Sequence, residues 1–452
     1  MGINMEKNVF IKTLLQAALD AGIEAAEVYA SSRDSFRAMS HNGEVDNYSV
    51  ASRSGLSLRG LYKGKMGYAA TEADDEEAIA QLVTGVIESA ELVEDEDIQE
   101  IYPGDEKYPE IDNYAPALDQ VSEKDKLRLL LDMEDKALHC GDNRIKQVNY
   151  NMVTTNSAAS RIVNTYGLDL SQRDNMIVGY VSVVAKEGDR VSTGSGFGFG
   201  RDFKALDADK MAKDAVEEAI FYLNAAPVPS GSYRVIIDRR CMPDLLSTFA
   251  SVFSADQAQK GMSLLAGKEG EKIAADCVTL MDDPHMPGGL ASSPFDAEGV
   301  ATKVKAVIEN GTLTTLLHNL KTARKAGVKS TGNASKSGYA APVGVSPSNF
   351  YFKPGTKSLA ELMQDMGDGL VITEVSGLHA GANPVSGDFS LLAKGYTVEK
   401  GQKGRAVEQI TVAGNFYTLL KNIRAFGSDL EFVGSPVGSP SVDVGEMNIA
   451  GK

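Results

Sequence analysis

Residues 145–200 read IKQVNYNMVTTNSAASRIVNTYGLDLSQRDNMIVGYVSVVAKEGDRVSTGSGFGFG. Val, Ile, Tyr, Phe and Thr recur through this stretch, and turn residues at 166–167 and 187–189 interrupt it. These features predict four strands, at Ile145–Thr154, Ala159–Thr165, Met176–Ala185 and Val191–Gly200. Helical patterns come only before and after the strands, at 123–139 and 207–223. Because runs of strands separated from helices are typical of antiparallel sheets, this order favours an α+β fold.

The first ninety residues have a similar order of elements. A helical apolar stripe spans 8–21, and a helix with an acidic N-terminus spans 75–92. Hairpin turns are expected at Asn42-Gly43 and at 62–65. The strand-like runs around these turns are Glu27–Ser31, Asp34–Ser40, Val45–Ala51, Gly55–Leu61 and Met66–Ala70. The order helix–strands–helix therefore occurs over 8–92 and again over 122–223, although sequence similarity does not establish a repeat.

A segment rich in Pro and Gly, AAPVPSGS at 225–232, is the clearest linker in the chain. We expect an N-terminal α/β domain at 1–224, with antiparallel sheets flanked by helices and two helix–strand–helix subunits at about 1–107 and 118–224. After the linker, a strand at 233–238 and a helix at about 242–255 precede glycine-rich strands and turns. This pattern predicts a β-rich C-terminal domain at 233–452 and an α+β fold overall.

The chain has 452 residues and a net charge of −17, which argues against nucleic acid or an anionic membrane as a direct partner. No run of 18 apolar residues occurs, and Met1–Asn8 has no signal-peptide pattern. The three cysteines are far apart and form no Cys-x-x-Cys pair, which is typical of a reduced compartment. We therefore expect a cytoplasmic protein.

The five histidines are not spaced as metal ligands. No two of them share a helical turn and no His-Glu-x-x-His motif occurs, whereas a catalytic zinc needs about three protein ligands. The run Asp282–His285 is typical of a solvated turn, and Gly196–Gly200 of a strand with crowded backbone. We expect no metal to be bound by this chain alone. The sequence does not decide whether a catalytic Ser-His-Asp or Cys-His group is present, because the members of such a group come together only in the folded chain.

Backbone-special residues concentrate at 377–390, which reads GLHAGANPVSGDFS. This density predicts a loop of defined shape, in which the main chain approaches another group closely. The polar side chains of the loop are His379, Asn383 and Asp388. Three further segments stand out: SPFDAEG at 293–299, KSTGNAS at 329–335 and GSPVGSP at 434–440.

Together these segments resemble the TldD/PmbA family, whose members are labelled proteases or modulators of DNA gyrase. The resemblance covers most of the chain and is densest from about 290 to 450. In this family, TldD-type subunits carry a His-Glu-x-x-x-His helix and a late cysteine that would hold zinc, and PmbA-type (TldE) subunits lack both. The matching helix here, Asp244–Asp256, has no histidine, and Gly434–Pro440 has no cysteine. The chain therefore resembles the PmbA/TldE type.

The resemblance implies peptide hydrolysis by a TldD–TldE heterodimer that acts on unstructured polypeptides. It also implies zinc in the TldD-like partner, and a C-terminal β-rich region that forms the dimer and the substrate cleft. A homodimer is the alternative when the partner is missing. A non-enzymatic protein that modulates a toxin–antitoxin or gyrase-linked complex is the alternative function, and a metal-independent hydrolase is a third.

We expect His379, Asn383, Asp388 and Asn333 to contact the peptide, which could add as a strand to an exposed sheet edge. The alternative for each residue is an ordinary structural role. The first three would form the hydrogen bonds of their own turn, and Asn333 would adopt the left-handed conformation in a turn. Asp296 and Glu298 are typical of solvated carboxylates rather than of a catalytic pair. The apolar helix at 416–423 is typical of core packing, with a subunit contact as the second interpretation.

Overall fold

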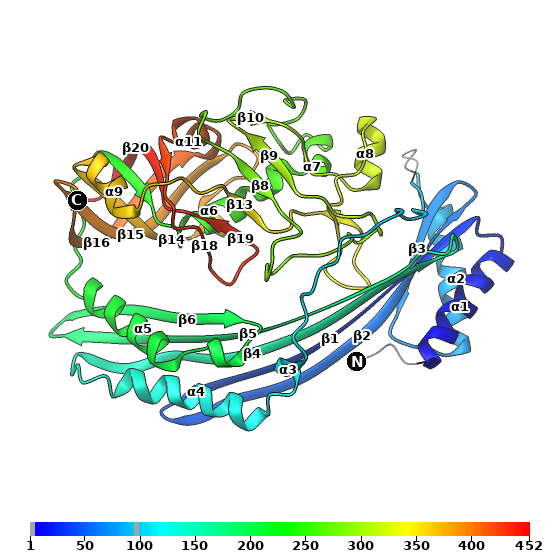
Figure 1. Ribbon diagram of the computed structural model, residues 1–452, viewed down its shortest axis with the longest axis horizontal. Helices are drawn as coiled ribbons and strands as arrows, with labels where there is room; N and C mark the ends of the chain where they lie inside the picture. Colours follow the sequence, from blue (N-terminus) through cyan, green and yellow to red (C-terminus); the bar gives the residue numbers. More distant parts are fainter. Residues whose placement is uncertain (1–4, 95–98) are drawn as a thin grey trace.

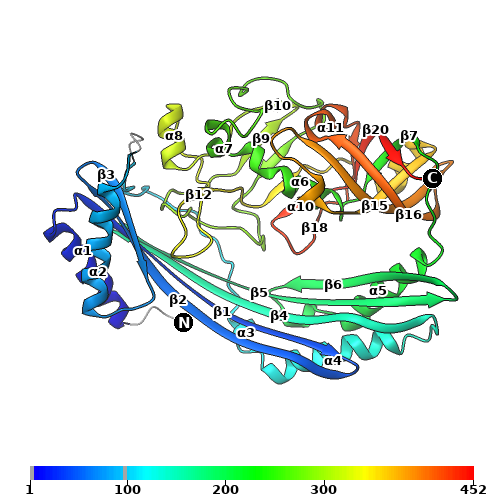
Figure 2. The ribbon, with the colours of Figure 1, turned by 180° about the vertical axis from the view of Figure 1, so that it is seen from behind.

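The computed structural model describes residues 5–94 and 99–452. A long, curved sheet formed by the N-terminal half lies beneath a β-rich C-terminal region, and the chain crosses from one to the other at the end near the C-terminus (Figure 1). Figure 2 shows the same two layers from behind, with α10 and β18 on the side of the C-terminal region that faces the sheet. This arrangement confirms the predicted α+β class.

The N-terminal sheet has six strands in the order β3-β2-β1-β4-β5-β6, all antiparallel. The strands are β1 (Ala25–His41), β2 (Glu44–Tyr62), β3 (Lys65–Thr71), β4 (Ile145–Asn164), β5 (Asp169–Glu187) and β6 (Arg190–Gly200). Both predicted hairpin turns are present: Asn42 and Gly43, and Lys63 and Gly64, all have positive φ. Each half of the sheet is a helix, three strands and a helix, and the halves join through β1 and β4.

The prediction of separate short strands was wrong at three places. Glu27–Ser31 and Asp34–Ser40 form one strand, as do Val45–Ala51 and Gly55–Leu61, and so do Ile145–Thr154 and Ala159–Thr165. The physical reason is that the face of the sheet towards the C-terminal region is polar. Ser31, Ser160 and Gln172 lie in one cross-strand row on that face. Polar residues therefore extend the strands instead of ending them.

The opposite face of the sheet is apolar and is covered by helices. The helices of this half are α1 (Met5–Asp20), α2 (Glu76–Glu91), α3 (Pro116–Asp119), α4 (Glu123–Leu138) and α5 (Ala208–Tyr222), with a 3-10 turn at Phe203–Ala205. Asp75, Ser122 and Asp207 cap α2, α4 and α5 through their side-chain oxygens. Under α4 and α5 the core contains Phe36, Val153, Ile177 and Val181. Burial of such side chains stabilises the layer by roughly 1.5–3 kcal/mol each.

A small barrel forms one part of the C-terminal region. Its sheet runs β16-β15-β14-β7-β20-β17, and β16 also pairs with β20, which closes the ring. The strands are β7 (Gly231–Ile237), β14 (Gly369–Ser376), β15 (Asp388–Glu399), β16 (Gln402–Asn415), β17 (Ala425–Phe426) and β20 (Val442–Ala450). Their inward side chains share one core with α6 and α11.

A second six-stranded sheet, β10-β9-β8-β13-β19-β18, lies beside the barrel. Its strands are β8 (Leu280–Asp282), β9 (Lys305–Glu309), β10 (Thr312–Leu313), β13 (Phe350–Phe352), β18 (Glu431–Phe432) and β19 (Val437–Ser439), and a separate pair is β11 (Ala334–Ser335) with β12 (Gly344–Val345). The helices are α6 (Met242–Phe249), α7 (Ala255–Gln259), α8 (Leu320–Ala326), α9 (Leu359–Met366), α10 (Leu378–Gly381) and α11 (Phe416–Asn422).

The helix predicted at 242–255 is shorter than expected. It ends at Phe249, a 3-10 turn follows at Ala250–Phe253, and Ser254 is extended before α7 begins. The extended backbone lets Ala255 N–H donate to the Leu317 carbonyl, so a tertiary contact replaces a helical hydrogen bond. The prediction for 416–423 was correct, since Phe416, Leu419, Leu420 and Ile423 are buried in the core.

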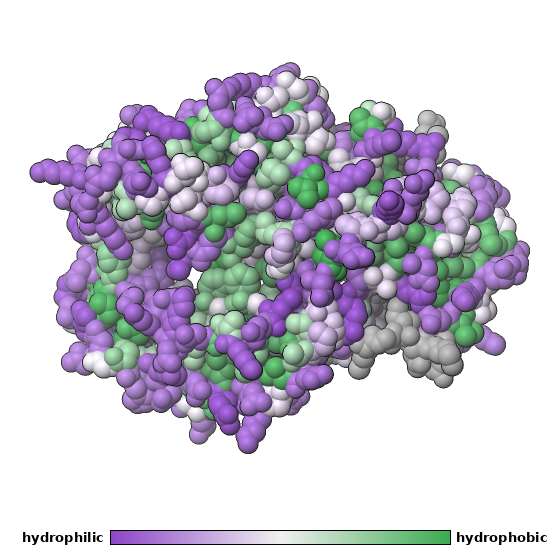
Figure 3. Space-filling view, in the orientation of Figure 1, coloured by the Kyte–Doolittle hydropathy of each residue, from purple (hydrophilic) through white to green (hydrophobic). Residues whose placement is uncertain are grey.

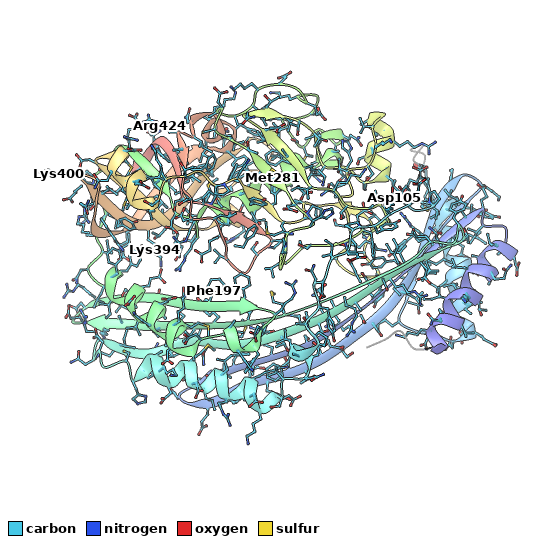
Figure 4. All side chains as sticks on the ribbon, viewed as in Figure 1. Asp105, Phe197, Met281, Lys394, Lys400 and Arg424 are labelled. Atoms are coloured by element: carbon cyan, nitrogen blue, oxygen red, sulfur yellow. The ribbon has the colours of Figure 1, made fainter. Side chains whose placement is uncertain are left out.

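The two layers contact each other at both ends. Near the linker, Lys394 of β15 bonds Glu218 of α5 at 3.2 Å, and Figure 4 shows Lys394 and Phe197 in the space between the layers. At the far end, Asp105 accepts the Ala301 N–H at 2.8 Å. Figure 3 shows hydrophilic residues over most of the visible face and paler, more apolar residues in the hollow between the layers. In the described part of the chain, no helix is long and apolar enough to cross a membrane.

Candidate functional site

Three segments that sequence analysis singled out meet in the C-terminal region. Helix α6 packs against β19 and against α10. Helix α6 lies in the segment that resembles the zinc helix of TldD-type subunits, β19 lies in 434–440, and α10 lies in the glycine-rich loop. The fold therefore brings α6 into contact with two segments that follow it by more than a hundred residues in the sequence.

The loop 377–390 is shaped by its own polar groups. Gly377 and Gly387 both have φ 83°. Asn383 Oδ1 accepts the Val385 and Ser386 N–H groups at 3.0 and 3.3 Å, and the Asn383 carbonyl accepts the Gly387 N–H at 2.8 Å. A side chain at Gly387 would overlap the ring of Tyr417. Gly387 is needed because the loop packs closely against its own chain, and Gly377 is needed because its backbone has a positive φ.

Asp388 and His379 differ in how they are held. Asp388 accepts a hydrogen bond from Asn415 Nδ2 at 2.9 Å, and this bond lowers the pKa of Asp388. His379 lies on α10 and is exposed. Asn383 and Asp388 thus form hydrogen bonds within the turn, as expected if they have a structural role. The side chains of His379, Asn383 and Asp388 all remain accessible on one loop. Their contact with substrate stays a prediction.

The residues around α6 do not fit a metal ion. The helix contains no histidine, and its cap residue Cys241 is buried, which raises the pKa of the thiol. Since the thiolate is the metal ligand, a buried thiol of raised pKa is a poor donor. Across residues 5–94 and 99–452, no group of three or more His, Cys, Asp or Glu side chains is placed to hold a metal.

Asn333 lies outside that loop, in a buried polar network. Its Nδ2 donates to Asp282 Oδ2 at 2.8 Å and to the Ser346 carbonyl at 3.1 Å. Lys305 Nζ bonds Asp282 Oδ2 at 2.6 Å and Asn333 Oδ1 at 3.1 Å. The left-handed residue of this segment is Gly332, with φ 72°. The expectation of a left-handed Asn333 was therefore wrong, because the glycine takes that conformation and the amide is needed inside.

Two expectations about acidic residues were also wrong. Asp282 is 0% exposed, so it is no solvated turn residue. Asp296 and Glu298 are buried as well. Asp296 accepts N–H groups from Glu298, Val300 and Ala334 at 2.9–3.1 Å, while burial raises its pKa. Tertiary contacts supply partners for these carboxylates that the sequence does not show.

Glu298 belongs to a buried ion-pair cluster that joins the layers. Arg59 of β2 bonds Glu27 of β1 at 2.8 Å and Glu298 of the C-terminal region at 3.0 Å. All three are more than nine-tenths buried, and burial raises the pKa of Glu27. Because removing one partner leaves an uncompensated buried charge, this cluster holds its layers in one arrangement.

Beside this cluster, a cavity of about 210 Å³ opens between the layers. Tyr29, Ser160 and Gln172 line it from the sheet, and Asp296, Asn333 and Lys336 are among the residues that line it from above. Gln172, Ala291 and Ser293 also line a neighbouring cavity of about 430 Å³. Sequence analysis missed Lys336 and Arg59, since a single lysine or arginine in a strand-rich region carries no local signal.

Comparison with known proteins agrees with the geometry over almost the whole chain. Three parts of one family match: PmbA/TldA metallopeptidase domain 1 at residues 26–90, the central domain at 116–220 and the C-terminal domain at 230–451. The chain therefore belongs to the PmbA/TldD metallopeptidase family, and it is PmbA-like.

Individual relatives extend this similarity. The chain is 27% identical to metalloprotease PmbA of Escherichia coli O157:H7, covering 98% of this chain and 97% of that one. A crystal structure from Thermotoga maritima, described as a candidate modulator of a DNA gyrase, is 33% identical with a TM-score of 0.91, and covers 98% of this chain and all of that one. TldE from Thermococcus kodakarensis, at 23% identity, has the same fold with a TM-score of 0.89, covering 98% of this chain and all of that one.

Proposed function

We propose that this chain is the non-zinc subunit of a TldD/TldE-type metallopeptidase that degrades or processes unstructured peptides in the cytoplasm. The observation that carries this proposal is the composition of α6 and β19. These elements pack together in a metallopeptidase fold, and neither contains a histidine, while the buried Cys241 is a poor donor. The catalytic zinc and its activated water would come from a TldD-like partner.

The loop 377–390 supplies what such a subunit needs beside a cleft. It joins β14 to β15, so it lies at the end of two barrel strands, and it presents His379, Asn383 and Asp388 on an accessible surface. A rigid turn at a strand end can read the backbone of an extended peptide through hydrogen bonds. We assign substrate contact to these three residues. Asn333 is assigned an indirect role, through the buried network that lines the interlayer cavity from the C-terminal region.

The proposal is tested by reconstitution with a TldD-like subunit that carries the His-Glu-x-x-x-His helix. We expect the two chains to copurify and the mixture to cleave a fluorescent unstructured peptide. A chelator should abolish cleavage and added zinc should restore it. Each chain alone should show at most a small fraction of the activity. Tight zinc binding and peptide cleavage by this chain alone would contradict the proposal.

The loop residues are tested in the same mixture. His379→Ala and Asp388→Ala should raise KM for the peptide several-fold and change kcat little, because they would bind substrate without taking part in bond cleavage. Exposed Lys400→Ala, in the β15–β16 turn, is the matched control and should change neither constant. A large loss of kcat with unchanged KM would favour a hydrolase that uses these residues directly.

A second function is a non-enzymatic binding protein that modulates a toxin–antitoxin or gyrase-linked complex. The specific support is that the similar Thermotoga maritima and Bacteroides thetaiotaomicron structures are described as candidate modulators of a DNA gyrase. This function predicts stable binding of a folded partner with no peptide cleavage in any mixture. The reconstitution experiment therefore separates the two functions.

A further inference from the structure

Lys336 follows the short strand β11 and extends from the C-terminal region onto the N-terminal sheet. Its Nζ lies 3.0 Å from Ser57 Oγ and 3.3 Å from the Tyr68 hydroxyl. The same nitrogen lies over the rings of Tyr29 and Tyr68, at 4.5 and 5.0 Å from their centroids. Lys336 thus lies between the layers with neutral neighbours in direct contact.

The hydrogen-bond partners of Lys336 suit an amine better than an ammonium. An ammonium has three N–H donors, and the side chains in direct contact offer two oxygen acceptors, so the third donor would face a tyrosine ring or the cavity. A neutral amine has two N–H donors, which Ser57 and Tyr68 satisfy, and its lone pair is then free. Tyr68 can accept because its own hydroxyl hydrogen is donated to the carbonyls of Tyr339 and Ala341.

The surrounding charges also favour the neutral amine over the ammonium. Among the described residues, no carboxylate lies within ion-pair distance of Lys336 Nζ. Burial and the nearby positive charge of Arg59 lower the pKa of Lys336 to about 7, against the opposing field of Glu27 and Glu298. Those two carboxylates are already paired with Arg59. Desolvation next to a second cation is a recognised way to activate a lysine nucleophile.

Lys336 is also reachable. It lines the interlayer cavity of about 210 Å³, and its side chain keeps part of its surface exposed. The cavity walls carry the side-chain hydroxyl or amide groups of Ser160, Gln172, Ser335 and Ser346. A small polar molecule could therefore enter and find hydrogen-bond partners beside the nitrogen.

We propose that Lys336 is a nucleophilic amine that condenses with a small polar carbonyl compound bound in this cavity. The Nζ lone pair attacks the carbonyl carbon and forms a C–N bond. The amine loses its two protons, and these leave with the carbonyl oxygen as one water molecule, which gives an imine. No oxidant or reductant is needed. This site does not depend on peptide hydrolysis or on a partner subunit.

The test uses pyruvate as the carbonyl probe, sodium cyanoborohydride to trap any imine, and peptide mapping by mass spectrometry on the intact chain. At pH 7 about half of an amine of pKa 7 is unprotonated, against about one part in 2,500 for an ordinary lysine of pKa 10.4. We expect Lys336 to be labelled at least about tenfold faster than any exposed lysine. Its labelling rate should rise between pH 6 and pH 8 and then level off.

Two variants complete the test. Lys336→Gln keeps a neutral side chain with hydrogen-bonding groups between the layers, and should lose the label at position 336 while it unfolds at the same urea concentration as the parent. Lys403→Gln is the matched control, because Lys403 also lies over two aromatic rings, those of Phe221 and Tyr396, and should leave the Lys336 label unchanged. Labelling of Lys336 no faster than exposed lysines, or a rate that still rises above pH 9, would overturn the proposal.

Discussion

At the scale of single residues, the buried network around Asp282 shows how much a carboxylate depends on its partners. Asp282 Oδ1 accepts hydrogen bonds from the Ser348 N–H and hydroxyl at 2.6 and 2.7 Å, and Oδ2 accepts from Lys305 and Asn333. Every acceptor position is used. The carboxylate thus joins β8, β9 and the loop 331–348.

Asp282→Ala should therefore be strongly destabilising. It would leave the Lys305 ammonium largely buried without its counter-charge, and we expect a loss of about 3–5 kcal/mol in the free energy of unfolding measured with urea. Glu217→Ala breaks an exposed pair with Lys213 and should cost less than about 1 kcal/mol. Equal effects of the two substitutions would contradict this account.

His318 provides a prediction about pH. It is 4% exposed, its Nδ1 has no hydrogen-bond partner among residues 5–94 and 99–452, and burial lowers its pKa. The folded state therefore binds this proton more weakly than the unfolded chain does. The stability that neutral His318 preserves is present above about pH 6.5 and is lost as the pH falls towards the lower, folded-state pKa.

This loss is measurable as a difference between variants. Between pH 7.5 and 5.5, His318→Gln should reduce the fall in unfolding free energy, by no more than the roughly 1.4 kcal/mol that an imidazole of pKa about 6.5, protonated only in the unfolded chain, gives over this range. His379→Gln is the control, because His379 is exposed, and it should leave the fall unchanged. An unchanged pH dependence in His318→Gln would show that this histidine titrates alike in both states.

At the scale of elements, the glycines of β6 explain why α5 lies so close to the sheet. A Cβ at Gly196 would lie 1.8 Å from the backbone carbonyl oxygen of Met211, and one at Gly194 would lie 2.3 Å from that of Ala215. The sequence predicted a strand with crowded backbone at Gly196–Gly200, and the structure confirms it at Gly196. The crowding comes from the helix backbone.

Gly196→Ala should push α5 away from β6. Since the clash is with backbone atoms, relief requires movement of the whole helix, and we expect a loss of about 1–3 kcal/mol in thermal or urea unfolding. Gly338→Ala is the matched control, because a Cβ there meets no atom within 4 Å and the backbone has no positive φ. A neutral Gly196→Ala would mean that the helix can shift at little cost.

At the scale of the whole molecule, the ion pairs of Arg59 with Glu27 and Glu298 connect the sheet to the C-terminal region. All three residues of this cluster are more than nine-tenths buried. Arg59→Met would leave two buried carboxylates facing each other. We expect a loss of about 3–5 kcal/mol, and faster hydrogen exchange in β1, β2 and 296–302.

Two further variants distinguish charge from packing at this contact. The triple variant Glu27→Leu, Arg59→Met, Glu298→Met removes every charge and should recover much of the lost stability, because desolvation of the ions is then avoided. Arg324→Met breaks a solvent-exposed pair with Glu100 between the same layers and should cost less than about 1 kcal/mol. A triple variant no more stable than Arg59→Met would contradict the charge argument.

The amino-acid sequence alone determined the local features of this protein. Hairpin turns at Asn42-Gly43 and Lys63-Gly64, capped helices and the α+β class follow from backbone preference and periodicity, which act over a few residues. The resemblance to the PmbA/TldE type followed from the absence of histidine in Asp244–Asp256 and of cysteine in Gly434–Pro440. The division into domains at 225–232 and the substrate role of the loop residues stay predictions.

The tertiary structure decided the rest. It showed that polar runs such as Thr155–Ser160 continue a strand, because the sheet face below the C-terminal region is polar. It buried Asp282, Asp296 and Glu298, and it placed Lys336 between two tyrosines of the other layer. Each of these depends on partners tens to hundreds of residues away in the sequence, and burial and electrostatic environment exist only once the chain has brought those partners together.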